Sequence, residues 1–134
     1  MSVEVKIEER AVELAAALGV TGLKLNVKSN TGWPDRMFLI PGGHPFFIEF
    51  KQPGEEPEPR QRVVHAHLAY LQYDCETHDN AEEAAAAIKA RLDSAVKGGW
   101  RHSTDQAAAA LDAARISKES GKVPPRARGR RVVP

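Results

Sequence analysis

Cysteine is almost missing from this chain of 134 residues, in which Cys75 is the single example. A lone cysteine excludes an internal disulfide framework and is typical of a protein in a reducing cytosol. The chain also lacks any apolar run near the roughly 20 residues of a membrane span, and no signal peptide opens it. These absences predict a cytoplasmic protein that does not cross a membrane.

A strong excess of one charge is missing as well. Nineteen Lys and Arg residues against 18 Asp and Glu residues give a net charge of +1, which by itself does not indicate a polyanionic partner. There is no internal repeat. Hydrophobic residues at 42% and charged residues at 28% are ordinary for a soluble globular protein. The length suits a single domain with a modest core.

The sequence that is present alternates between helical and strand-like patterns. Residues 2–18 carry apolar side chains at helical spacing, with Ser2 placed to cap the helix and Gly19 to end it. Strand patterns then occupy residues 23–27, 36–40, 46–51 and 73–77, and helical patterns occupy residues 60–72 and 80–96. The order α-β-β-β-α-β-α predicts an α/β fold, with a mixed sheet flanked by helices.

The C-terminal part has a different composition. Gly98 and Gly99 break the pattern, and residues 103–117 read as one more alanine-rich helix. Residues 122–134 carry one lysine and four arginines without an acid, together with three prolines. We expect a domain at residues 1–97, a helical extension at 98–121 and a disordered basic tail at 122–134.

Two charged side chains interrupt the apolar strand at residues 46–51 (FFIEFK). Because side chains alternate across a strand, Glu49 and Lys51 should point to one face, and Ile48 and Phe50 to the other. Opposite charges on an apolar strand are costly to bury unless they are paired or bound to a metal. The pair is therefore a candidate site, and a simple structural ion pair is the alternative.

Asp35 is expected to lie close to this pair. It follows a turn at residues 32–34 (GWP) and precedes the strand at 36–40, and residues 41–45 (PGGHP) return the chain as a hairpin. Neighbouring antiparallel strands bring residues within about 5 Å of each other. Asp35 and Glu49 can thus converge on one oxygen-rich site, and such ligands favour Mg²⁺ or Mn²⁺ over zinc. An aspartate that only serves the turn is the alternative.

Four motifs occur in a defined order along the chain. Residues 32–36 (GWPDR) match the pattern GxPDR, and residues 48–54 (IEFKQPG) match (V/I)ExKxPG. Gln61 and Leu68 fit a Q-x6-L helix, and residues 4–8 (EVKIE) fit an N-terminal helix with an E-x-x-I pattern. This set resembles the PD-(D/E)XK nuclease superfamily, and within it the small stand-alone phage form of the VRR-NUC (virus-type replication-repair nuclease) domain. The resemblance covers about residues 2–92 and implies a restriction-endonuclease-like core.

The resemblance also implies roles for individual residues. Asp35, Glu49 and the backbone carbonyl of Phe50 would bind the metal ion, while Lys51 would stabilise the charge that develops on the phosphate. The N-terminal helix should add a further acid. The E-x-x-I pattern favours Glu4, with Glu8 one turn later as the alternative.

Three other side chains have more than one reading. Gln61 is expected to approach the attacking water or a phosphate, although a solvated polar residue would give the same pattern. Trp33 either packs against the core, which is the favoured reading, or stacks on an unpaired base. His65 and His67 are interpreted as structural or surface residues, because no cysteine or further histidine completes a zinc site around them.

The function implied by the resemblance is metal-dependent endonucleolytic cleavage of DNA. Branched substrates such as Holliday junctions or flaps are expected, as in DNA repair, and two symmetric nicks would suit a two-fold homodimer. A phage-encoded enzyme would work in the cytoplasm of its bacterial host. Two other classes stay open: a non-catalytic DNA-binding or assembly module on the same fold, and a metal-dependent hydrolase of a small molecule.

Overall fold

The computed structural model describes residues 1–28, 31–100, 109 and 112. The chain divides into two units, Met1–His102 and Ser103–Pro134, and the architecture below is that of the first. Residues 109 and 112 are helical, but the rest of the predicted helix at 103–117 and the basic tail at 122–134 lie outside the described residues. The boundaries expected near residues 97 and 121 stay predictions.

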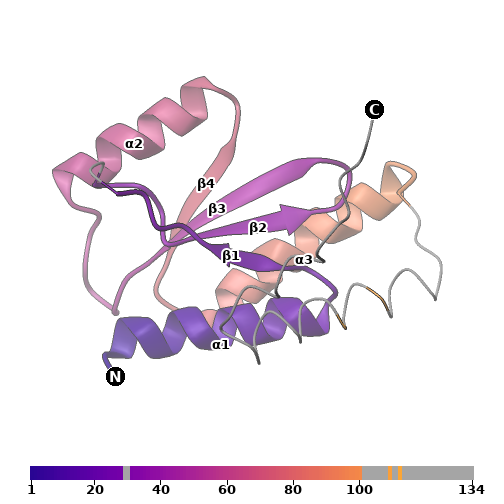
Figure 1. Ribbon diagram of the computed structural model, residues 1–134, viewed down its shortest axis with the longest axis horizontal. Coiled ribbons are helices and arrows are strands. Elements are labelled where there is room, and N and C mark those ends of the chain that lie inside the picture. Colours follow the sequence, from indigo (N-terminus) through magenta and orange to yellow (C-terminus); the bar gives the residue numbers. More distant parts are fainter. Residues whose placement is uncertain (29–30, 101–108, 110–111, 113–134) are drawn as a thin grey trace, which may run out of the picture. The chain divides into compact units, whose positions relative to one another are not determined.

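The first unit has the predicted order of elements. They are α1 (Val3–Ala17), β1 (Gly22–Lys24), β2 (Arg36–Ile40), β3 (His44–Phe50), α2 (Pro59–Tyr70), β4 (Asp74–His78) and α3 (Ala81–Lys97). The strands lie side by side in the order β1-β2-β3-β4. The first three are antiparallel, while β3 and β4 are parallel and joined by α2 (Figure 1). The prediction of a mixed sheet flanked by helices is confirmed.

Local side-chain chemistry sets the ends of the helices. The Ser2 hydroxyl accepts a hydrogen bond from the backbone N–H of Val5 at 3.1 Å, and Asn80 accepts one from Glu83 at 3.0 Å. Both residues therefore cap the helices that follow them, as predicted for Ser2. Gly19 has a φ of +82°, which a residue with a side chain rarely adopts, and it ends α1. Among the described residues, no helix has the length and apolar character needed to cross a membrane.

The two faces of the sheet differ in what covers them. Phe46, Ile48 and Phe50 of β3 are fully buried on the face covered by α1 and α3. Helix α2 lies on the opposite side of the sheet (Figure 1). Glu49 occupies that opposite face, because it alternates with the core residues along the strand. The predicted alternation of β3 is confirmed.

Most strand boundaries lie within one residue of the prediction, and two differ by more. Strand β1 ends at Lys24 rather than at residue 27, because its partner β2 begins at Arg36, after a turn that contains Pro34. Strand β3 begins at His44, so Pro45 lies inside the strand rather than in the hairpin loop. Pro45 faces Leu39, whose N–H donates instead to Thr21 of the chain before β1 at 2.9 Å. Leu39 thus directs its backbone hydrogen bond to the other side, and its pairing with Pro45 does not require the N–H that proline lacks.

Candidate active site

Asp35 and Glu49 lie next to each other because of the register between β2 and β3. The last pair of this ladder is Arg36 with Ile48, so continuing the antiparallel register by one residue places Asp35 opposite Glu49. The backbone N–H of Phe50 donates to Asp35 Oδ2 at 2.8 Å. This hydrogen bond fixes the Asp35 carboxylate against the end of β3.

Glu49 is a buried carboxyl group with too few partners. It is 2% exposed, and its Oε1 atom has no hydrogen-bond partner among the described residues. Its Oε2 atom accepts a hydrogen bond from the side-chain amide of Gln61 and lies 4.0 Å from Lys51 Nζ. An oxygen buried without a partner is rare in folded proteins, and it calls for an explanation such as a missing ion.

The pKa of Glu49 reflects the same deficit. Burial raises the pKa of its carboxyl, and so do the charge of Asp35 and a hydrogen bond to Asp35 that forms only when one of the two carboxyls is protonated. Lys51 acts in the opposite direction, and the resulting pKa is about 9. Two carboxyl groups that share one site cannot both ionise easily without added positive charge. At neutral pH the pair therefore holds a proton where a cation would be better accommodated.

Lys51 belongs to the same face of the sheet, directly after β3. Its side chain is 8% exposed, and its backbone N–H donates to the carbonyl of His78 at 3.0 Å. This hydrogen bond continues the contact between β3 and β4 past the last strand residue. The lysine is thus held at the end of the strand, beside the two carboxyls.

Gln61 is held from two sides at the start of α2. Its Oε1 atom accepts from the backbone N–H of Glu58 at 2.8 Å, which is half of a capping box, and its Nε2 donates to Glu49. Pro59 occupies the first turn of the helix, where its lack of an N–H has no consequence. The end of the helix and the carboxyl site are therefore linked through one side chain.

The structure separates the two candidate acids of α1. Glu4 is half-buried, and its pKa is raised by burial and then by the charge of Asp35, so it belongs to the electrostatic surroundings of the site. Glu8 is 4% exposed and accepts from Arg36 Nε at 2.6 Å and Lys24 Nζ at 3.1 Å. Its charge is already neutralised by two cations of the sheet.

The donor set fits a hard divalent cation. Among the described residues, no three His, Cys, Asp or Glu side chains lie together closely enough to hold a metal by themselves. Asp35 and Glu49 offer two carboxylates, one of them with an unpartnered oxygen, and the Phe50 carbonyl is the nearby backbone acceptor. Mg²⁺ is commonly bound by one or two carboxylates and completes its shell with water and substrate oxygens.

His65 is a residue of this region that the sequence interpretation did not assign to the site. It lies one helical turn after Gln61, and its Nε2 atom is buried without a hydrogen-bond partner among the described residues. Burial lowers the pKa of His65, and the charge of Lys51 lowers it further, so the imidazole is neutral at pH 7. The sequence could have indicated this position, because His65 lies four residues after Gln61 and three before the buried Leu68, and such residues share one face of a helix.

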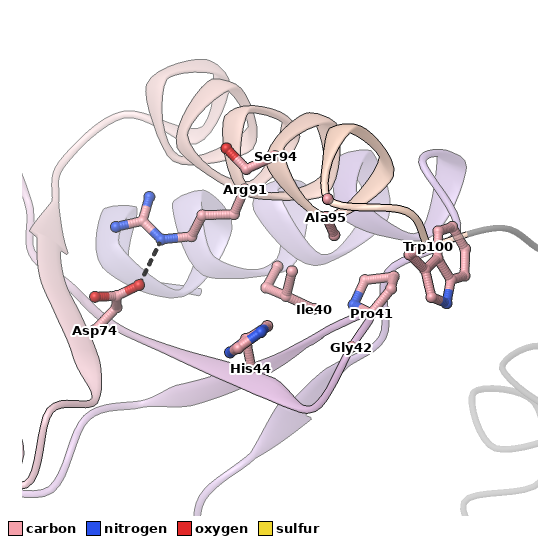
Figure 2. Close-up of a pocket in the computed structure, with 10 residues that line it drawn as sticks. Ile40, Pro41, Gly42, His44, Asp74, Arg91, Ser94, Ala95 and Trp100 are labelled. Atoms are coloured by element: carbon pink, nitrogen blue, oxygen red, sulfur yellow. Dashed lines mark hydrogen bonds and ion pairs between the residues drawn. The ribbon is translucent and has the colours of Figure 1, made fainter.

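A cavity of about 680 Å³ lies at the other end of the sheet from the carboxyl pair (Figure 2). It is lined by Ile40 at the end of β2, His44 at the start of β3, residues of α3 such as Ser94, and Trp100 just after that helix. Asp74 and Arg91 form an ion pair of 3.3 Å there. Asp35 lies just before the first residue of β2, and Ile40 is its last residue. The cavity is therefore separated from the carboxyl pair by the length of this strand.

Comparison with known proteins agrees with this architecture. A solved structure described as a VRR_NUC domain superimposes with a TM-score of 0.61 at 23% sequence identity. The match covers 66% of this chain and 97% of that one. The fold is therefore that of a VRR-NUC domain, as the sequence motifs predicted.

A sequence comparison gives the family. The chain is 37% identical over 68 residues to a protein named "Putative nuclease p44" from Acyrthosiphon pisum secondary endosymbiont phage 1. The match covers 51% of this chain and 73% of the phage protein. No protein-family model matches the chain. The chain therefore belongs to the family of this phage protein, and its fold is that of a VRR_NUC domain.

Proposed function

We propose that this protein is a nuclease that hydrolyses phosphodiester bonds of DNA with the help of Mg²⁺ or Mn²⁺. The observation that carries the proposal is the pairing of Asp35 with the buried Glu49, since this pair of carboxyls has only Lys51 beside it to balance its charge. The name of the phage relative points to the same activity. A purely structural ion pair does not account for the site, because Lys51 does not neutralise both carboxyls.

Asp35, Glu49 and the backbone carbonyl of Phe50 would hold the metal ion. When bound, the ion supplies a Lewis acid for the phosphate and lowers the pKa of a water molecule. The hydrogen bond from Phe50 N–H keeps Asp35 in place, and the amide of Gln61 does the same for Glu49. The protein thus orients both ligands before the substrate arrives.

Lys51 would stabilise the negative charge that develops on the phosphate. Its ammonium group lies 4.0 Å from Glu49 and is largely shielded from solvent, where a charge acts more strongly than in water. Gln61 would orient the attacking water, since it already spans Glu49 and the first turn of α2. These roles require no movement of the backbone.

Glu4 is the acid of α1 that we assign to the site, rather than Glu8. The Glu8 carboxylate is bound to Arg36 and Lys24 at 2.6 and 3.1 Å, so its contribution is to hold α1 against the sheet. Glu4 responds to the charges of both Asp35 and Lys51. It would accept a proton or bind a water molecule at the edge of the site.

The resemblance to the family extends the proposal to the substrate. We infer branched DNA, such as Holliday junctions or flaps, and a two-fold homodimer that places two nicks symmetrically. A role in phage DNA repair or replication within the host cytoplasm follows from the same resemblance and from the phage relative.

One panel of reactions tests the proposal. Labelled four-way junctions, flaps and linear duplexes are incubated with the full chain in Mg²⁺, Mn²⁺ or EDTA. We expect cleavage that depends on the metal and is fastest on a branched substrate. Cleavage that persists in EDTA would contradict the metal site. Binding to DNA without cleavage under any condition would favour the non-catalytic module instead.

A further inference from the structure

A groove of about 420 Å³ lies between the turn before β2 and the first turns of α2. Four of its lining residues are apolar, namely Trp33, Pro59, Val63 and Val64, and two are basic, namely Arg60 and His67. The groove is separate from the cavity at the other end of the sheet, since the two share no lining residue.

The groove adjoins the carboxyl site on both of its walls. Trp33 precedes Asp35 by two residues on one wall, and Arg60 is the neighbour of Gln61 on the other. A molecule seated between these walls would therefore have its next covalent neighbour close to the site that we propose for the scissile phosphate. This adjacency restricts the occupant more than the apolar lining does.

The two walls are packed directly against each other. Gly32 has a φ of +95°, and a Cβ atom on it would lie 2.8 Å from the carbonyl oxygen of Arg60. Arg60 Nε also donates to the carbonyl of Thr31 at 3.1 Å. The turn and the start of the helix are thus in direct contact beside the groove, and Gly32 permits this close approach.

The groove offers an aromatic side chain, an apolar wall and a nearby positive charge. The indole of Trp33 is half-buried, and its Nε1 atom is buried without an acceptor among the described residues. Opposite it, Val63 is 69% exposed, which is unusual for a valine. Arg60 adds a positive charge at the rim. An aromatic side chain, an apolar wall and a nearby cation form a combination that suits a nucleobase on its phosphodiester chain.

We propose that this groove binds one unpaired nucleobase of the substrate, next to the phosphate that is cleaved. The inference rests on the proposed function, because the carboxyl site supplies the reason why a nucleotide would be adjacent. It makes Trp33 a specificity-determining residue: the enzyme would prefer DNA with an unpaired base at the cleavage position. This differs from the sequence interpretation, which favoured packing for Trp33.

Fluorescence tests the contact without any cleavage. The chain has two tryptophans, so a Trp100→Phe variant reports on Trp33 alone. In EDTA, it is titrated with a duplex that carries a short single-stranded thymidine arm, and with the same duplex whose arm is abasic. We expect quenching of Trp33 by the thymidine arm only. Equal responses to the two arms, or no response to either, would overturn the proposal.

Binding affinities give a second, independent readout. Wild-type protein should bind the thymidine arm more tightly than the abasic arm, by about 5- to 100-fold if one base stacks. The ratio should approach one in Trp33→Leu and in Val63→Asp, and it should persist in Trp33→Phe. Tyr70→Leu is the matched control, because Tyr70 is 81% exposed on the same helix and does not line the groove.

Melting temperatures accompany these measurements, and the ratio between two DNAs is unaffected by a loss of folded protein. If Trp33→Leu does not fold, the affinity ratio of Val63→Asp still tests the groove, because Val63 is exposed and its replacement should not prevent folding. Wild-type protein that cleaves DNA but binds both arms equally would overturn the groove and leave the proposed function intact. Quenching by the thymidine arm without cleavage of any substrate would contradict the proposed function and support the groove.

Discussion

Glu8 and Glu49 are two buried glutamates on opposite faces of one sheet, and their surroundings are opposite in kind. Glu8 is 4% exposed and binds two cations, Arg36 at 2.6 Å and Lys24 at 3.1 Å. Glu49 is 2% exposed, has an oxygen without a partner among the described residues, and shares its site with a second carboxyl group. Burial alone does not distinguish the two.

The comparison shows which buried charge is structural and which is available for chemistry. A carboxylate that is fully paired stabilises the contact between a helix and a sheet and has no capacity for a further ligand. A carboxyl whose pKa is raised by burial and by a like charge is poorly accommodated until a cation arrives. Glu8 fits the first description, and Glu49 fits the second.

The largest expected effect comes from the cation on the Glu49 side. Lys51→Ala removes the charge that we propose to act on the phosphate and leaves both carboxylates, so cleavage should fall about 10²- to 10³-fold, as when one stabiliser of a developing oxyanion is lost. DNA binding should persist. Cleavage kinetics and thermal melts measure this, with Lys89→Ala as the control, since Lys89 is 59% exposed in a surface pair with Asp93.

A destabilised Lys51→Ala protein that still cuts at the wild-type rate would reduce the lysine to a structural ion pair. Glu49→Gln should lower cleavage to a similar extent, but through weaker metal binding. Excess Mn²⁺ should therefore rescue Glu49→Gln in part and should not rescue Lys51→Ala.

For Glu8, we expect a mutation to lower stability and to leave cleavage almost unchanged. Glu8→Gln leaves Arg36, whose side chain is 17% exposed, without its carboxylate partner, and should lower the free energy of unfolding by about 3 kcal/mol. The cleavage rate per folded molecule should stay close to that of the wild type. Denaturant titration and kinetics at a temperature where the variant is folded measure both. A folded Glu8→Gln protein without activity would make Glu8, rather than Glu4, the acid of α1.

A smaller effect is expected at Gln61, which connects the site to α2. Gln61→Ala removes one hydrogen bond to Glu49 and one to the Glu58 backbone, and should lower the free energy of unfolding by about 1–3 kcal/mol. Cleavage should fall less than in Lys51→Ala, because both metal ligands and the lysine remain. Urea melts and rates for the two variants, measured side by side, give the order; equal losses of activity would show that Gln61 contributes as much to the reaction as the charge of Lys51.

The pH dependence of stability also separates the two glutamates. The folded pKa of Glu49 is raised from 4.5 to about 9, so the folded protein keeps a proton that the unfolded chain has released. This contribution to stability is fully present below pH 4.5 and is lost as the pH rises through about 9. Metal-free wild-type protein should therefore lose stability over this interval, and Glu49→Gln should lose less. Parallel curves for the two proteins would contradict the raised pKa.

Much of this fold could be predicted because local patterns and global structure agree. The alternation of residues 46–51, the caps at Ser2 and Asn80 and the hairpin glycines each specify their own element, and the motifs around Asp35, Glu49 and Lys51 specify the family. The end of β1 could not be predicted in the same way. It depends on where β2 begins to pair, which is a tertiary property.

The sequence also could not predict which side chains surround each acidic residue. Glu4 and Glu8 are equivalent as helix residues, and only the packing of α1 on the sheet brings Arg36 and Lys24 to one of them. His65 and the groove beside Trp33 likewise arise from the way α2 meets the turn before β2. Such contacts join segments that are distant in sequence, so no local pattern records them.

The central claim is that Asp35 and Glu49 bind a divalent ion in place of a shared proton. Calorimetric titration of the metal-free protein with Mn²⁺ at pH 7, in buffers of different ionisation enthalpy, counts the protons released on binding. The account predicts binding with release of about one proton per ion, unchanged in Glu8→Gln and strongly weakened in Glu49→Gln. Absence of binding to the wild type, or binding that survives in Glu49→Gln without proton release, would contradict it.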